Sequence, residues 1–212
     1  MGKARRQAVD ERKEVVAAMK AKLKREERRR KIKIYGITAV VLLALAGTVT
    51  SVIVVDQQNK SQTRAAASKP IDGVQSFDGL SRNHTSNQVA YPQNPPVGGD
   101  HAPVWINCGT YTHPVNVWEG VHSLEHGAVW ITYRPDLPQP QIAALTKQAT
   151  SHPYELLSPY PGLPSAVVAS AWGKQLKLDS ADDPRLPVFL QAYLQGPQTP
   201  EPGAACSGGV QG

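Results

Sequence analysis

Residues 121–133 read VHSLEHGAVWITY, and this stretch decides the fold around it. Its second half, 128–133, is rich in β-branched and aromatic residues and is followed by RPDLP, which predicts a strand that stops at a turn. Its first half is followed by Gly127, and glycine commonly ends helices. We therefore expect a helical turn over 120–126 that leads directly into a strand over 128–133.

The flanking sequence predicts a compact α+β domain over residues 70–202, followed by a tail over 203–212. A short strand is expected at 115–118, a helix at 139–150 with Pro140 in its first turn, a strand at 164–172 and a second helix at 184–195. Segment 80–104 carries clustered Gly, Asn, Pro and Asp, so it should be mostly loop. The expected order of the domain is β-β-α-β-α.

The N-terminal third has a different character. Residues 1–33 contain fourteen basic and five acidic residues, a net charge of +9, whereas residues 34–212 carry −3. Residues 34–55, IYGITAVVLLALAGTVTSVIVV, contain no charge. As a helix they would span about 33 Å, enough to cross a bilayer core. This run exceeds the apolar region of a typical cleaved signal peptide, so we expect a retained single-pass transmembrane helix.

The basic flank sets the expected orientation. Lys and Arg before a single span favour a cytoplasmic N-terminus, with residues 56–212 outside the cytoplasm. Residues 56–69 are polar and predict a linker. Residues 9–33 contain no Pro or Gly and predict a basic helix, either solvated or lying on anionic lipid at the cell membrane. Because no aromatic residue interrupts it for base stacking, we expect no nucleic-acid partner.

Histidines are concentrated in one part of the chain. Five of the six lie between residues 84 and 126. His122 and His126 are four residues apart, and on a helix this spacing places both rings on one face, close enough to bind one metal ion. On a strand the same pair would lie about 13 Å apart. The alternative is that these rings only hydrogen-bond loop carbonyls and stabilise the fold.

A site built from His101, His122 and His126 suits copper or zinc. Cys108 could supply a fourth ligand. Glu125 could bind the ion, and either Asp100 or Glu125 could orient an imidazole by a hydrogen bond from behind. Cys108 and Cys206 are the only cysteines, and an isolated pair in an oxidising compartment normally forms a disulfide. We therefore favour a Cys108–Cys206 disulfide over a Cys108 metal ligand.

The sequence from His122 to His126 also fits H-x-x-E-H, the inverted zinc-peptidase motif, in which Glu125 would activate water. That mechanism needs a third ligand, and Glu201 lies 75 residues further on in a Pro-rich stretch. Gly127 also interrupts the long helix that such peptidases use. A metallohydrolase is therefore an alternative rather than the main interpretation.

Several motifs together resemble the bacterial, mainly actinobacterial, domain of unknown function 3105. They are Tyr91 with Pro95-Pro96-x-x-Gly99-Asp100-His101, Trp105-x-x-Cys108-Gly109-x-Tyr111, His122-Ser-Leu-Glu125-His126-Gly127, Ala171-Trp172-Gly173 and Pro200-Glu201. The resemblance covers roughly residues 70–202. It implies a short cytoplasmic segment, one membrane span and an outer domain, and it names no reaction.

These observations favour a membrane-anchored extracytoplasmic domain that binds copper or zinc without catalysing a reaction. Two alternatives stay open. In the first, the protein is an accessory subunit of a membrane protein complex and the histidines are structural. In the second, it is a metallohydrolase that uses Glu125 as a base.

Overall fold

The computed structural model describes residues 2–212, except for the side chains of residues 2–12, 14–15, 37, 39–47 and 49–51. The chain divides into two compact units, residues 1–59 and 60–212. Helix α1, Gly2–Ala67, includes the helix predicted over 9–33. The expected linker is helical as far as Ala67, because no Pro or Gly interrupts residues 48–67 and the segment ends in three alanines.

The backbone of residues 34–55 is helical, as predicted. Among the residues that the structure describes, no helix is long and apolar enough to cross a membrane. Most side chains of the predicted span lie outside those residues, so its insertion in a membrane stays a prediction.

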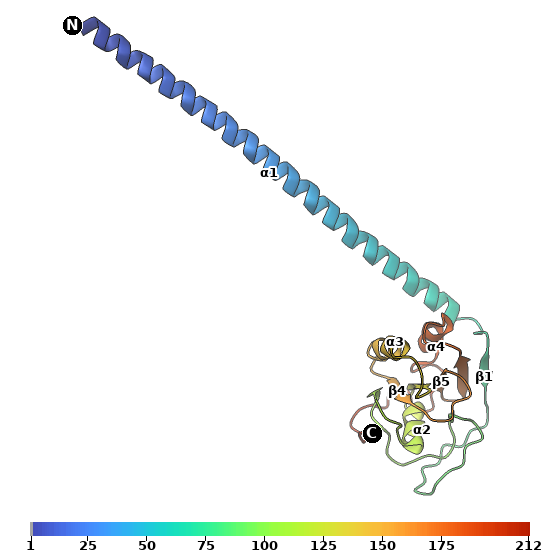
Figure 1. The fold of residues 1–212 in the computed structure, drawn as a ribbon. Helices are drawn as coiled ribbons and strands as arrows, with labels where there is room; N and C mark the ends of the chain where they lie inside the picture. The colour runs from blue at the N-terminus through green and yellow to red at the C-terminus, as the bar shows by residue number, and fades with distance from the viewer. Residues whose placement is uncertain (1) are drawn as a thin grey trace. The chain divides into compact units, whose positions relative to one another are not determined.

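The second unit is an α+β domain with a six-stranded mixed sheet (Figure 1). Its elements are β1 (Val74–Ser76), β2 (Gly109–Thr110), α2 (Val117–Glu125), β3 (Val129–Tyr133), α3 (Gln139–Ala149), β4 (Glu155–Pro159), β5 (Val167–Ala171), β6 (Lys174–Leu178) and α4 (Arg185–Tyr193). The strand order is β1-β6-β5-β3-β4-β2. Strand β4 pairs in parallel with β3 and β2, and the other neighbours are antiparallel.

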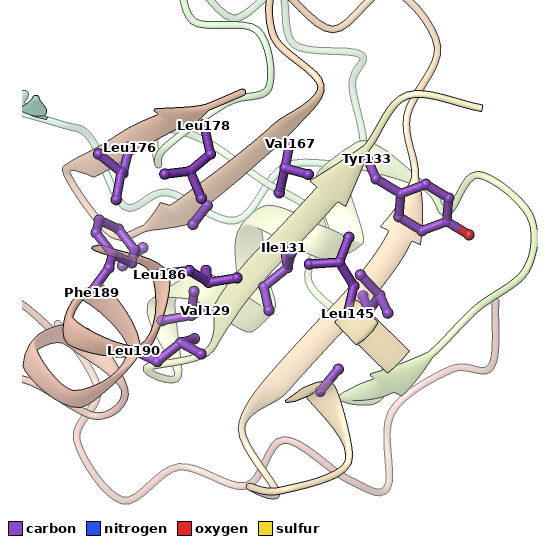
Figure 2. Close-up of a cluster of buried hydrophobic side chains, with 14 of the residues drawn as sticks. Val129, Ile131, Tyr133, Leu145, Val167, Leu176, Leu178, Leu186, Phe189 and Leu190 are labelled. Atoms are coloured by element: carbon purple, nitrogen blue, oxygen red, sulfur yellow. The ribbon is translucent and has the colours of Figure 1, made fainter. Parts of the chain in front are cut away.

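Strand β3 lies at the centre of the domain, and its alternating side chains contribute to two cores. Val129 and Ile131 join the core that α3 and α4 cover, which Figure 2 shows in close-up. Trp130 faces the opposite side and packs with Leu124 of α2. Because successive residues of a strand point to opposite faces, α2 and the residues around it lie across the sheet from α3 and α4.

Four predicted elements are confirmed, with slightly shorter bounds: strand 128–133 is β3, helix 139–150 is α3, strand 164–172 is β5 and helix 184–195 is α4. The helical turn over 120–126 is part of α2. The strand predicted at 115–118 is wrong. Asn116 accepts a hydrogen bond from the Trp118 backbone amide at 3.0 Å and starts α2 there, so the helix cap prevails over the strand preference of this segment.

Candidate metal centre

Helix α2 is held closely against the sheet, and this contact positions the central residues. Gly120 lies over the Trp130 ring, where an added Cβ would come within 2.8 Å of a ring carbon. The helix then stops: His126 is its C-cap, and Gly127 follows with a φ of 94°. His122 and Glu125, three residues apart and both buried, therefore share one face of a short, fixed helix.

Two loop residues approach this face. His84 and His101 form an isolated β-bridge, in which the Thr85 amide donates to the His101 carbonyl at 2.8 Å. The Asp100 carboxylate accepts from the Asn83 side-chain amide at 3.0 Å, which ties the two loop segments together. One ligand atom from each of His84, His101, His122 and Glu125 can be chosen so that all four lie within 4.8 Å of one another.

Backbone carbonyls fix the protonation of three imidazoles. Nδ1 of His101 lies 2.7 Å from the Gly99 carbonyl, Nδ1 of His122 lies 2.6 Å from that of Ala102, and Nδ1 of His126 lies 2.7 Å from that of Ala205. A carbonyl oxygen only accepts, so each Nδ1 carries a hydrogen. In the neutral ring, Nε2 then carries a lone pair, and this tautomer can bind a metal through Nε2.

These Nε2 atoms face other acceptors at short range. His101 Nε2 lies 2.9 Å from Glu125 Oε2, and His84 Nε2 lies 3.5 Å from the same oxygen. His122 Nε2 lies 3.0 Å from His126 Nε2. Without a cation, each of the two shortest contacts needs an additional proton between two acceptors. The arrangement is therefore one that a bound cation satisfies.

The pKa of His122 favours metal binding over protonation. Burial, together with the neighbouring His126, His101 and His84 rings, lowers the pKa of His122 to about 4, against the opposing effect of its bond to the Ala102 carbonyl. At neutral pH this ring is uncharged, and its lone pair is available.

The donor set fits a zinc or copper ion in chemistry and size. Three imidazole nitrogens and one carboxylate oxygen are ordinary ligands for both metals. Bonds of about 2.0–2.1 Å place tetrahedral neighbours about 3.4 Å apart, so the widest separation here would close by about 1.4 Å on binding. Of these four residues, His84 has the most room to move, because its side chain is 46% exposed.

The family comparison agrees with the resemblance found in the sequence. The family described as "Protein of unknown function (DUF3105)" matches residues 83–208, a segment that contains all four residues of the cluster. The chain belongs to this family. No curated protein and no solved structure matches the chain. DUF3105 membership assigns no reaction to the site, so its chemistry has to be argued from geometry.

In this DUF3105 domain, the structure brings together two of the three predicted histidine ligands. His101 and His122 belong to the four-residue cluster, and Glu125 joins them as a potential ligand. His126 lies outside the cluster but touches it through His122. Sequence reasoning did not select His84, because no periodic pattern connects a loop residue to His101; the only signal was its place in the histidine-rich window.

Cys108 is not available as a metal ligand. It forms a disulfide with Cys206, as favoured from the sequence, with the two Cα atoms 5.3 Å apart. The Cys108 amide also donates to the Cys206 carbonyl at 2.7 Å. The predicted tail is thereby fixed to the domain and provides the Ala205 carbonyl that orients His126. A disulfide is typical of a domain outside the cytoplasm.

Two observations bear on the hydrolase motif: Glu201 lies near His126, and the carboxylate of Glu125 is already in contact with other side chains. Glu201 Oε2 lies 3.5 Å from His126 Nε2, although the sequence placed this residue in a Pro-rich tail. Glu125 Oε2, the atom that would have to activate water, instead lies between the His84 and His101 rings. In this position the carboxylate contacts two imidazoles, so it is not free to accept a proton from water.

Proposed function

We propose that this DUF3105 protein holds one zinc or copper(II) ion outside the cytoplasm, through His84, His101, His122 and Glu125, and that it does so without catalysing a reaction. The observation that supports this most strongly is the fixed tautomers. Backbone carbonyls hold the protons of His101 and His122 on Nδ1, and both Nε2 lone pairs are directed into a buried cluster that contains a carboxylate.

A purely structural cluster would be built differently. Buried polar groups in proteins normally pair a donor with an acceptor, because an unpaired one costs about 1–3 kcal/mol. Here two imidazole nitrogens face each other at 3.0 Å, and the 2.9 Å contact between His101 and Glu125 needs either a proton or a cation. A metal ion would satisfy several of these atoms at once, whereas a scaffold role needs a separate proton for each of the two contacts.

The choice of metal follows from the absence of sulfur. Copper(I) prefers thiolate and thioether ligands. Both cysteines are joined in the disulfide, and both methionines precede residue 20, far along the chain from the histidines. Imidazole and carboxylate ligands suit zinc and copper(II), and copper(II) binds such sites more tightly.

Burial supports a binding role over catalysis. His101, His122 and Glu125 are at most 3% exposed, and Glu125 is used as a ligand. A catalytic zinc site keeps an open coordination position and a free base for water. In our proposal both are occupied, and the only exposed ligand is His84.

We further propose that residues 34–55 anchor the domain to the cell membrane, with residues 1–33 in the cytoplasm against anionic lipid. The charge-free stretch, the +9 charge before it and the disulfide after it support this orientation. Protease treatment of intact cells should degrade residues 60–212 and spare an N-terminal tag. Protection of the whole chain would contradict the orientation.

The metal proposal is tested by elemental analysis of the full chain, purified in mild detergent and loaded with zinc or copper(II) before dialysis. We expect about one equivalent of metal. His122→Asn should abolish it, because asparagine can still donate to the Ala102 carbonyl but lacks the Nε2 lone pair. His113→Asn is the matched control, since His113 is exposed and outside the cluster.

Two results would contradict the proposal. Metal at background level in the wild-type chain would leave the histidines as scaffold and favour the complex-subunit interpretation. One equivalent retained in folded His122→Asn would show that the ion binds elsewhere.

A further inference from the structure

The four-ligand cluster does not account for two neighbouring side chains, His126 and Glu201. His126 is almost completely buried, yet its Nε2 takes no hydrogen bond from a backbone group; it lies 3.0 Å from His122 Nε2 and 3.5 Å from Glu201 Oε2. The Glu201 side chain is 49% exposed. A line of ligand atoms thus runs from solvent, through His126, to a member of the buried cluster.

We propose that His126 and Glu201 form a second, solvent-facing position for a divalent cation, which passes the ion to and from the buried centre through His122. The proposal rests on the proposed function, because the buried centre is the source and destination of the ion. The transfer is a ligand exchange in which His122 binds the ion in either of the two positions. No covalent bond of the protein is made or broken.

His122 can act as the shared ligand because of where its Nε2 lies. The atom belongs to the cluster with His84, His101 and Glu125, and it also contacts His126. A single imidazole nitrogen has one lone pair and binds one cation at a time. The two positions are therefore alternatives for the same ligand, which is the requirement for a stepwise transfer.

The outer position is held in place by the backbone. The Glu201 amide donates to the Glu125 carbonyl at 3.1 Å, so Glu201 is tied to the end of α2. The Ala205 carbonyl fixes the tautomer of His126, and the disulfide at Cys206 anchors that segment. The Trp105 ring lies against both imidazoles, with centroid distances of 4.8 Å to His126 and 5.6 Å to His122.

The number of ligands sets the direction of transfer. The outer position offers one imidazole and one exposed carboxylate beside the shared His122, whereas the buried centre offers three further ligands with that residue. An ion at equilibrium should therefore lie in the buried centre, and the outer position should control how fast it enters and leaves.

The test measures zinc exchange by the full chain in detergent, with transfer of zinc from the loaded protein to a chromophoric chelator followed in a stopped-flow instrument. Glu201→Gln and His126→Asn should both keep about one equivalent of zinc at equilibrium. Both should slow release by about tenfold, a change of about 1.4 kcal/mol in the barrier. In His126→Asn the amide can still donate to the Ala205 carbonyl.

Asp182→Asn is the matched control for the loss of one exposed carboxylate. Asp182 lies in the loop before α4, and the residue before it, Ala181, packs against the core that α3 and α4 cover. This variant should exchange zinc at the wild-type rate. Release at the wild-type rate from both His126→Asn and Glu201→Gln would overturn the transfer proposal and leave the proposed function intact. Loss of tightly bound zinc in either variant would also overturn it, by making that residue a ligand of the main centre. A wild-type chain that binds no zinc would overturn both proposals.

Discussion

Replacement of Glu125 by glutamine separates a metal centre from a structural ion pair, because only the metal centre predicts that the variant loses a zinc-dependent gain in stability. The Glu125 carboxylate lies 2.9 Å from His101 Nε2. In a structural ion pair, the imidazolium donates to this carboxylate. In a metal centre, the same two atoms both bind the cation.

The expected size of the effect follows from this contact. Glu125→Gln places an amide N–H within reach of the His101 lone pair, and such a neutral hydrogen bond is worth about 0.5–1.5 kcal/mol. The metal-free variant should therefore unfold within about 1 kcal/mol of the wild type. In a structural ion pair the glutamine carbonyl can still accept from the His101 imidazolium, so the stability measured without metal does not separate the two interpretations.

With zinc bound, the wild type and Glu125→Gln should differ in stability. Zinc at a hundred times its Kd stabilises the folded protein by about 2.7 kcal/mol. For a domain of this size that corresponds to about 5–10 °C in Tm. Glu125→Gln should lose most of this increase, because the variant lacks the only carboxylate in the cluster.

The assay is thermal unfolding of the full chain, followed by tryptophan fluorescence with zinc and with a chelator. His113→Asn is the control. A wild type whose Tm does not respond to zinc, or a Glu125→Gln chain whose Tm rises as far as that of the wild type, would refute the metal-centre reasoning.

Three further predictions concern the framework of the site. Gly120→Ala should destabilise the domain by about 1–3 kcal/mol in chemical denaturation, because its new Cβ meets the Trp130 ring at 2.8 Å; an unchanged midpoint would mean that α2 is not fixed as described. The double variant Cys108→Ser/Cys206→Ser should lose up to about 4–5 kcal/mol, since the disulfide joins residues 98 apart, and reducing agent should lower wild-type stability but not that of the variant. Burial raises the pKa of Glu155 from 4.5 to about 7, so the folded state holds this proton more tightly than the unfolded state, and the free energy of unfolding should fall by about 3 kcal/mol as pH rises through this interval. Glu155→Gln should be more stable than wild type at pH 8 and equal to it at pH 4. Equal stability of the two chains at both pH values would contradict the assignment.

The parts of the fold that were predicted from sequence are those in which local signals agree with packing. In β3, β-branched and aromatic residues coincide with complete burial, and Gly127 marks the change from helix to strand. Strand β2 has only two residues and forms through pairing with β4, so no local pattern predicts it. The strand expected at 115–118 is wrong because one side chain, Asn116, caps a helix there.

The residues of the candidate site also fall into two groups, those connected by a local sequence pattern and those brought together only by the fold. His122 and Glu125 are connected by helical spacing, which sequence shows directly. His84 and Glu201 reach the cluster through loops that are held by tertiary hydrogen bonds, the first through the bridge to His101 and the second through the Glu125 carbonyl. Those bonds join residues 16 or more apart in sequence, and no local pattern encodes them.

The ligand shell of the metal-loaded protein tests the central claim most directly. X-ray absorption at the zinc edge, recorded on the full chain loaded with one equivalent, should show three imidazole nitrogens and one carboxylate oxygen at about 2.0–2.1 Å. His84→Ala should remove one imidazole from that shell, and His113→Asn should leave it unchanged. A shell of water-like oxygen atoms with no imidazole, identical in wild type and His84→Ala, would contradict the account.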